Sequence, residues 1–310
     1  MVRTEVAPAG GRCQMVFKMS RLNSWFGRIG AILLVSVGLS GAETSWRPLF
    51  NGRDLKGWET FLTRPDASWE VPGLKRDASG KYLEPIGRNR DPLKAFRIET
   101  VDGSPAIHLT GQGFGVMTTT EAFANIHLRL QVKWGGMKWG SKIKSPRDCG
   151  LLYFVHGDPG YDHETWPRSI EFQIQEHDMG DLFALGAQIT VHARPETVDG
   201  KTLYHYDPAA APILFRQVPP IGNRCVKRGD PEKPNGEWNT LELFCFNGDS
   251  IHIVNGQVVM RLSHAERLDG SAPAALASGQ ISLQIEGAEV FYRDVEVRPI
   301  TAVPAEFAEP

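Results

Sequence analysis

The sequence is poor in cysteine, balanced in charge and free of any long apolar run. Its 310 residues contain 4 cysteines, which are too few and too scattered for a disulfide framework or a zinc-ligand cluster. The 34 basic and 36 acidic side chains leave a net charge of -2, so no broad field would gather nucleic acid or an anionic membrane. We therefore expect neither a nucleic-acid partner nor a membrane partner.

The first apolar run, residues 29–41, is 13 residues long, whereas a membrane-spanning helix needs roughly 20. Lys18, Arg21 and Arg28 precede this run, and small residues follow it. That order is typical of a secretory signal. We expect residues 1–42 to be a signal peptide and the remaining chain to be exported, either to the periplasm or out of the cell.

A sustained helical period is also missing beyond residue 43. Short alternating or continuous apolar stretches recur instead, bounded by Gly, Pro, Asn and Asp, and they predict strands. These stretches are AIHLTG, GVMTT, NIHLRLQVKW, CGLLYFVHG, SIEFQIQE, AQITVHA, EWNTLELFCFNG, SIHIVNGQVVMRL, GQISLQIEG and VEVRPI. Asn-Gly at 247–248 and at 255–256 predicts hairpin turns. The pattern predicts an all-β, two-layer antiparallel sandwich that forms a single domain over residues 43–310.

Two stretches rich in Pro, Gly and charge do not alternate: 63–91 and 196–235. We expect both to be long loops. Loops of this length in a compact β domain often form the walls of a site.

Five blocks of the sequence resemble the 3-keto-disaccharide hydrolase family, in the order in which that family has them. They are LFNGRDLKGWE at 49–59, CGLLYF at 149–154, IEFQIQ at 170–175, EWNTLELFCFNGDSIHIVNGQ at 237–257 and GQISLQIEGAEVFYRDVEVRPI at 279–300. The resemblance implies a concanavalin-like jelly roll, bacterial and often exported, that acts on sugars oxidised at the third carbon. A YDHETW insertion at 161–166 and the long loop after Lys201 depart from the family pattern and imply a different substrate.

The stretch SIEFQIQEHDMGD, residues 169–181, combines strand alternation with many hydrogen-bonding side chains. In an extended strand one face would hold Glu171, Gln173 and Gln175. The other face would hold Ile170, Phe172 and Ile174. We expect the apolar face to pack in the sandwich and the polar face to line an open sugar-binding groove.

Glu171, Gln173 and Glu176 are similar to the acid pattern of concanavalin-like retaining glycosidases, whose middle member is an aspartate. Such enzymes need two carboxyl groups about 5 to 5.5 Å apart. Glu176 would reach the groove only through a bulge. The neutral Gln173 also argues against direct glycoside hydrolysis.

A 3-keto sugar needs different chemistry, because its carbonyl makes the C2 proton acidic and the glycosidic oxygen on C1 can then leave by elimination. A general base, help at the carbonyl oxygen and an acid at the leaving group would suffice. We predict Glu171, Gln173, Glu176 and Arg168 as the catalytic set. The predicted substrate-binding residues are Trp166, Gln175, Asp181 and His192. A divalent metal ion would suit the same region as a Lewis acid, with His156, Glu171 and His177 as its predicted ligands, although no fixed-spacing metal motif is present.

Three functions remain open at this point. The first is an exported enzyme that cleaves 3-keto-glycosides or 3-keto-disaccharides, with net hydrolysis after hydration of the product. The second is a retaining glycoside hydrolase acting on unoxidised glycan, and the third is a non-catalytic carbohydrate-binding module. Each of the three has a carbohydrate partner.

Overall fold

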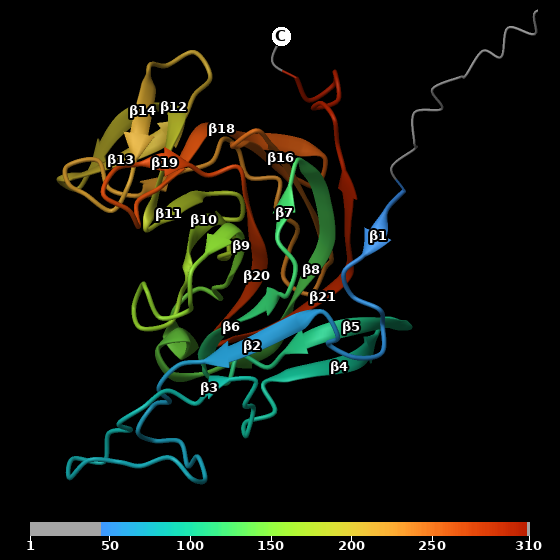
Figure 1. Ribbon diagram of the computed structural model, residues 1–310, viewed down its shortest axis with the longest axis vertical. Helices are drawn as coiled ribbons and strands as arrows, with labels where there is room; N and C mark the ends of the chain where they lie inside the picture. The colour runs from blue at the N-terminus through green and yellow to red at the C-terminus, as the bar shows by residue number, and fades with distance from the viewer. Residues whose placement is uncertain (1–44, 309–310) are drawn as a thin grey trace, which may run out of the picture. The chain divides into compact units, whose positions relative to one another are not determined.

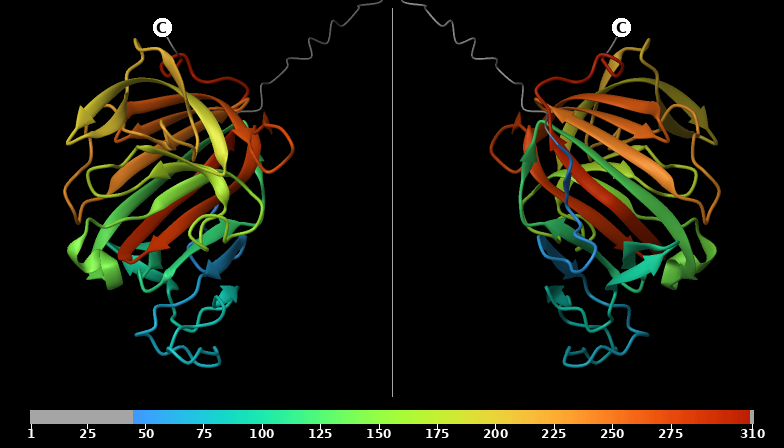
Figure 2. Two further views of the ribbon diagram at one scale, coloured as in Figure 1. Left: turned by 90° about the vertical axis from the view of Figure 1, so that its left-hand side faces the viewer. Right: turned by 90° about the vertical axis from the view of Figure 1, so that its right-hand side faces the viewer.

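Every strand ladder in the described part of the chain is antiparallel, and the ladders form two sheets (Figures 1 and 2). The computed structural model describes residues 45–308. One sheet has twelve strands, and its main path runs in the order β13-β12-β18-β17-β16-β8-β21-β5-β4. These strands are β13 (Lys201–Tyr206), β12 (Ala187–Val198), β18 (Gln257–Arg267), β17 (Asp249–Val254), β16 (Asn239–Phe246), β8 (Ile126–Lys138), β21 (Ala288–Pro299), β5 (Ser104–Leu109) and β4 (Phe96–Val101). Three short strands lie off the path: β1 (Arg47–Pro48), β14 (Pro212–Phe215) and β19 (Ala274–Ala275).

The second sheet has nine strands in the order β15-β11-β10-β9-β20-β6-β2-β3. They are β15 (Arg224–Cys225), β11 (Leu182–Leu185), β10 (Arg168–Gln173), β9 (Gly150–His156), β20 (Ser278–Glu286), β6 (Phe114–Thr119), β2 (Trp58–Leu62) and β3 (Gly87–Arg88), with β7 (Phe123–Ala124) beside β20. The described helical structure is one 3₁₀ turn, η1 (Gly140–Lys144), which connects β8 to β9. Within residues 45–308 no helix has the length and apolar character to cross a membrane.

The predicted all-β, two-layer antiparallel fold is confirmed, and each stretch predicted as a strand contains one. Both Asn-Gly hairpin turns are confirmed as well. Asn247 and Gly248 have φ of 53° and 88°, and Asn255 and Gly256 have 49° and 78°, the left-handed pair of a type I′ turn. The predicted signal peptide, residues 1–42, lies outside the described residues.

The apolar faces of the two sheets pack against each other through alternating residues. Ile170 and Phe172 of β10 lie in the main core beside residues of the twelve-stranded sheet such as Leu243. Polar contacts also cross this core, among them Tyr153 Oη of β9, which lies 2.8 Å from Ser250 Oγ and 3.0 Å from His252 Nε2 of β17. Both sheets therefore turn one face inward and leave the other face for surface sites.

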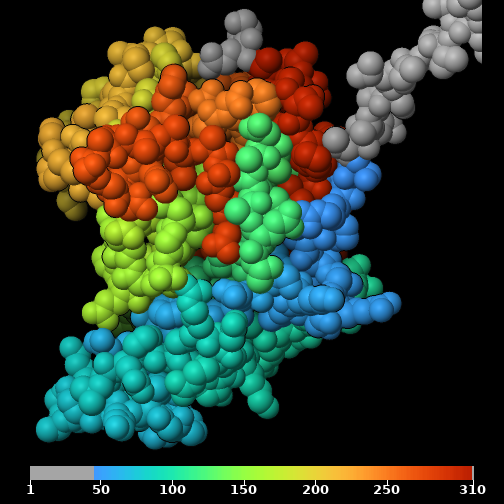
Figure 3. Space-filling model, in the orientation of Figure 1, coloured from blue at the N-terminus to red at the C-terminus, as the bar shows by residue number. Residues whose placement is uncertain are grey.

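The two predicted loops have different outcomes. Residues 63–86 do form a long connection between β2 and β3, seen in Figures 1 and 3 at the end of the sandwich that carries the N-terminal strands. The prediction of a loop over 196–235 is wrong, because that stretch holds the end of β12 together with β13, β14 and β15. Its strands are short and half exposed, so they carry little of the apolar alternation by which a buried strand is recognised.

Candidate functional site

The outward face of the nine-stranded sheet carries a row of polar side chains across three neighbouring strands. Glu171 of β10 pairs with Leu152 of β9, and Leu152 pairs with Ser282 of β20. Because side chains alternate along a strand, Glu171 and Gln284 lie on this same outward face. The predicted separation of Glu171 and Gln173 from the apolar residues of β10 is thus confirmed.

Gly150 lets these side chains meet across β9. A Cβ atom at this position would lie 2.3 Å from Glu171 Oε1 and 2.7 Å from Gln284 Oε1. Both distances are far shorter than a van der Waals contact, so any other residue would push the two side chains apart. The absence of a side chain at Gly150 creates the space in which Glu171 and Gln284 interact.

Two further acids and one lysine complete this cluster. Lys142 Nζ of η1 binds the Asp148 carboxylate and lies 3.0 Å from Glu286 Oε1. All three side chains are largely buried. Lys142 therefore pairs with two of the three carboxyl groups, Asp148 and Glu286, while Glu171 is influenced by both of these acids. An excess of carboxyl groups over cations favours protonation of the cluster.

Burial is the main cause that raises the pKa of Glu171 well above its usual range, and the nearby Glu286 and Asp148 carboxyl groups raise it further. Burial and Asp148 also raise the pKa of Glu286 to about 8, although Lys142 opposes them. Burial alone would lower the pKa of Lys142, but the charges of Glu286 and Asp148 outweigh it and the pKa is raised. Carboxyl groups with raised pKa values at the edge of a hollow are typical of acid–base sites.

The hollow itself has a volume of about 320 Å³. Its lining combines two carboxyl groups, one cation, an imidazole, two aromatic rings and two hydroxyl groups, from Thr63, Arg64, Phe114, His163, Glu164, Thr165, Trp166 and Glu286. Glu286 is therefore the member of the acid cluster that lines the open space. The long connection after β2 contributes Thr63 and Arg64, which fits the expectation that a long loop borders the site.

The segment between β9 and β10 forms one wall of this hollow. Thr63 Oγ1 donates a hydrogen bond of 2.7 Å to the Glu164 carbonyl, and Arg64 forms an ion pair with the Glu164 carboxylate at 3.3 Å. Trp166 is 7% exposed and packs with Leu152 and its neighbours on the sheet. The YDHETW insertion thus covers part of the polar row.

This cover explains a difference from the expected open groove. Glu171 and Gln173 are only 5% and 7% exposed. Gln173 Oε1 accepts a hydrogen bond of 2.8 Å from the Ile174 amide, which satisfies it locally. Glu171 has no such backbone partner in the described part of the chain, and its surroundings are mainly acidic.

Glu176 lies beyond the end of β10 and is held by other partners. Its carboxylate is 2.5 Å from Arg147 Nη1, accepts the Arg147 amide at 2.7 Å and accepts Asn235 Nδ2 at 2.6 Å. Burial alone would raise the pKa of Glu176, but these hydrogen bonds outweigh burial and the pKa is lowered. A carboxylate held ionised in this way does not suit the role of a protonating partner for Glu171.

The remaining predicted residues divide between the wall and other parts of the molecule. Arg168 lies with its guanidinium 4.2 Å from the centre of the Tyr161 ring, beside the covering segment. Gln175 donates to Asp178 at 2.5 Å, and the fully buried Asp181 is paired with Arg224 at 2.7 Å. These contacts stabilise the turn after β10. His192 lies on β12, in the other sheet.

The predicted metal ligands His156, Glu171 and His177 do not fit a shared ion. Among residues 45–308 no group of three or more His, Cys, Asp or Glu side chains is arranged to hold a metal. His177 is strongly exposed, and its imidazole Nδ1 lies 3.9 Å from Asp230. His156 Nδ1 donates to the Phe154 carbonyl at 3.0 Å. We therefore derive no step through a metal ion at these three residues.

Sequence reasoning missed Lys142, Asp148, Gln284 and Glu286. A signal existed for the last two, because GQISLQIEG places Gln280, Ser282, Gln284 and Glu286 on one face by the alternation that revealed Glu171. No comparable signal existed for Lys142, which lies in a stretch that reads equally well as an exposed basic loop.

Residues 45–298 match the model of the family described as the 3-keto-alpha-glucoside-1,2-lyase-like domain. No match is found among curated proteins. Among solved structures, a candidate glycosyl hydrolase from Parabacteroides distasonis ATCC 8503 is similar at 18% identity, with 84% of this chain and 95% of that chain covered and a TM-score of 0.45. The carbohydrate-binding module CBM66 from Bacillus subtilis is similar at 8% identity, over 66% and 91% of the two chains, with a TM-score of 0.36.

Proposed function

The chain belongs to the family of 3-keto-alpha-glucoside-1,2-lyase-like domains, and from this premise we propose that it cleaves the glycosidic bond of 3-keto-glycosides by elimination. The observation that supports the proposal most directly is the acid cluster of Asp148, Glu171 and Glu286 beside the hollow. Elimination needs a base and an acid but no nucleophile, and a cluster of carboxyl groups that share protons supplies both.

In this proposal Glu286 is the general base, because it is the acid of the cluster that lines the hollow. Its carboxylate takes the proton from C2 of the 3-keto sugar, and the electron pair moves to form the enolate. Arg64, also in the lining, is the cation that stabilises the enolate oxygen. The C1–O bond then breaks, which leaves a double bond between C1 and C2.

Glu171, a member of the predicted catalytic set, has a different role from Glu286 in this proposal. Burial and the nearby Glu286 carboxyl group raise the pKa of Glu171 well above its usual range, which favours its protonated form. It supplies a proton that reaches the leaving oxygen through the cluster, so the number of protons balances. Water added across the C1–C2 double bond then gives net hydrolysis. An aromatic wall at Phe114 and Trp166 provides surfaces for the sugar ring.

The test is to incubate the protein with a 3-keto-glucoside and with its unoxidised parent. We expect cleavage of the keto sugar alone, and a kcat/KM that rises with pH through about 8, since the base must lose its proton. Cleavage of the parent glucoside would contradict the proposal and indicate a glycoside hydrolase. Binding without turnover of either sugar would indicate a carbohydrate-binding module.

Two matched variants separate the roles of the acids. Glu286→Gln should lower kcat by about 10²- to 10⁴-fold and remove the rise in activity near pH 8, because the amide cannot accept the proton. Glu171→Gln should lower kcat with little change in KM. Full activity in Glu171→Gln would remove Glu171 from the mechanism.

A further inference from the structure

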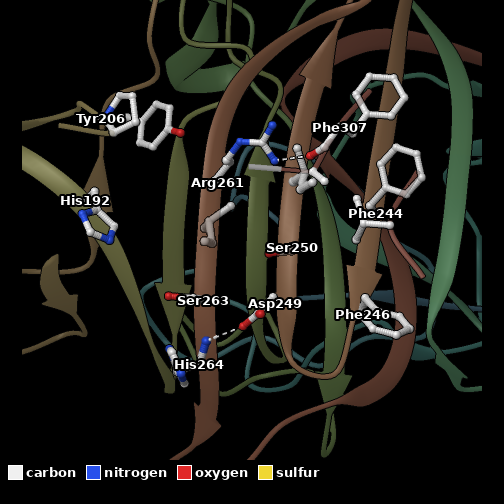
Figure 4. Close-up of a pocket in the computed structure, with 15 residues that line it drawn as sticks. His192, Tyr206, Phe244, Phe246, Asp249, Ser250, Arg261, Ser263, His264 and Phe307 are labelled. Carbon is white, nitrogen blue, oxygen red and sulfur yellow. Dashed lines mark hydrogen bonds between the residues drawn. The ribbon is translucent and has the colours of Figure 1, made fainter. Parts of the chain in front are cut away.

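A larger hollow, of about 460 Å³, lies on the twelve-stranded sheet (Figure 4). Volumes of about 300 to 1,000 Å³ are typical of small-molecule sites. Strands β16, β17 and β18 contribute Phe246, Asp249, Arg261 and His264, and the segment after β21 contributes Phe307. The proposed cleavage uses none of these residues.

This hollow lies on the outward side of its sheet. Ser250 and His252 of β17 face Tyr153 of the other sheet, so the alternating Asp249 and Ile251 face away from it. Glu171 lies on the outward side of the other sheet. The two sites are therefore on opposite faces of the sandwich and would not compete for one ligand.

A hairpin places an aromatic ring beside a carboxylate in this hollow. Phe246 and Asp249 are cross-strand partners on either side of the Asn247-Gly248 turn. The His264 amide donates a hydrogen bond of 2.9 Å to Asp249 Oδ1, which fixes the carboxylate, and Asp249 remains exposed. A half-buried ring next to an exposed acceptor can bind the C–H face of a sugar while accepting its hydroxyl groups.

His264 itself has a φ of 56°, in the left-handed region that favours glycine. Glycine would adopt this backbone conformation at lower energy, yet the residue at this position carries an imidazole, which lies at the rim of the hollow. Backbone strain of this kind is found more often at functional sites than elsewhere.

The opposite wall supplies hydrogen-bonding groups of both kinds. Arg261 donates to the Phe307 carbonyl, which holds the segment after β21 against the sheet. His192 Nδ1 lies 2.7 Å from the Ala210 carbonyl, so this nitrogen carries the proton and Nε2 is left as an acceptor. The ring of His192 lies at the edge of the hollow in Figure 4.

The charges of the lining select against other ligands. Asp249 and Arg261 balance each other, and Arg261 is already bound to the Phe307 carbonyl, so a phosphate would meet no excess of cations. A lipid chain would cover Asp249 and His264 without offering them hydrogen bonds, which is unfavourable. Rings interleaved with neutral and balanced polar groups suit a neutral polyhydroxylated ligand.

We propose that this hollow is a second carbohydrate site, which binds the end of a neutral oligosaccharide separately from the cleavage site. The inference does not depend on the proposed cleavage, because binding is measured without turnover. His192 was predicted as a substrate-binding residue of the cleavage site. In this proposal it binds carbohydrate in the second site instead.

Isothermal titration calorimetry of the full chain with maltotetraose and with cellotetraose tests the proposal. We expect binding of at least one of them in the millimolar range, weakened about tenfold or more by Phe246→Ala and by Asp249→Asn. Glu171→Gln should bind as the wild type does. The Asp249→Asn side chain still has an oxygen that can accept the hydrogen bond from the His264 amide, so we expect this variant to fold. It therefore tests the site even if Phe246→Ala fails to fold.

Met137→Ala, at an exposed apolar residue of β8, is the control and should leave binding unchanged. Cleavage of the 3-keto-glucoside should be unaffected by Asp249→Asn. The proposal is overturned if neither oligosaccharide binds, or if binding is lost in Glu171→Gln and retained in Phe246→Ala and Asp249→Asn.

Discussion

Gly150 shows how the absence of one side chain builds the acid cluster. We predict that Gly150→Ala lowers the free energy of unfolding by about 1–3 kcal/mol, because the added methyl group forces Glu171 and Gln284 apart. Activity toward the keto sugar should fall with it. Urea unfolding and steady-state kinetics measure the two effects.

Gly136→Ala is the matched control, since a Cβ atom there would meet nothing within 4 Å. It should change neither stability nor activity by much. An equal loss in both variants would show that glycine is needed for the strands in general and not for the space at Gly150.

The residues of the site were only partly predictable from the sequence. Glu171 is recognisable because it alternates with Ile170 and Phe172, and this alternation is local. Lys142 and Asp148 belong to the connection between β8 and β9 and reach Glu286 only through the pairing of distant strands. Periodicity contains no information on such contacts.

At the scale of the strand, β20 ends in a glutamate that is costly to ionise. The unfolded chain loses the Glu286 proton near pH 4.5, whereas the folded chain keeps it until about pH 8. Between these values the folded state binds more protons, so the free energy of unfolding should fall as pH rises. Urea unfolding at pH 5, 6, 7 and 8 measures the slope.

Glu286→Gln should flatten this slope, because the amide does not titrate. Glu84→Gln, at an exposed position in the connection between β2 and β3, should leave it unchanged. A slope that is identical in wild type and Glu286→Gln would show that other groups cause the dependence.

Strand elements were predictable where one face is buried and uncertain where both faces are exposed. The core strands β8, β16 and β20 alternate between apolar and polar residues, β9 is a continuous apolar run, and all four were expected. The edge strands β13 and β14 owe their structure to pairing with β12, a tertiary contact that outweighs their weak local preference.

At the scale of the whole molecule, Tyr153 links the two sheets through a buried polar contact. His252 Nδ1 donates to the Gly180 carbonyl at 3.0 Å, so its Nε2 accepts the Tyr153 hydroxyl. Tyr153→Phe should therefore lower the free energy of unfolding by about 1–3 kcal/mol, since it leaves Ser250 and His252 without this partner. Tyr204→Phe, at a partly exposed tyrosine of β13, should cost less, and both are measured by urea unfolding.

The two-layer architecture followed from the sequence, but the order of its strands did not. Alternation shows that β8 and β21 each have a buried face, yet nothing local shows that Val132 pairs with Tyr292. Pairings between distant segments depend on the whole set of packing contacts.

The thiol groups of Cys149, Cys225 and Cys245 are all free and buried in the described part of the chain. Burial raises the pKa of each one, so little nucleophilic thiolate forms. Residues 45–308 therefore fold with these three thiols reduced. Thermal unfolding should be the same with and without dithiothreitol, and a lower melting temperature in the reductant would reveal a covalent cross-link.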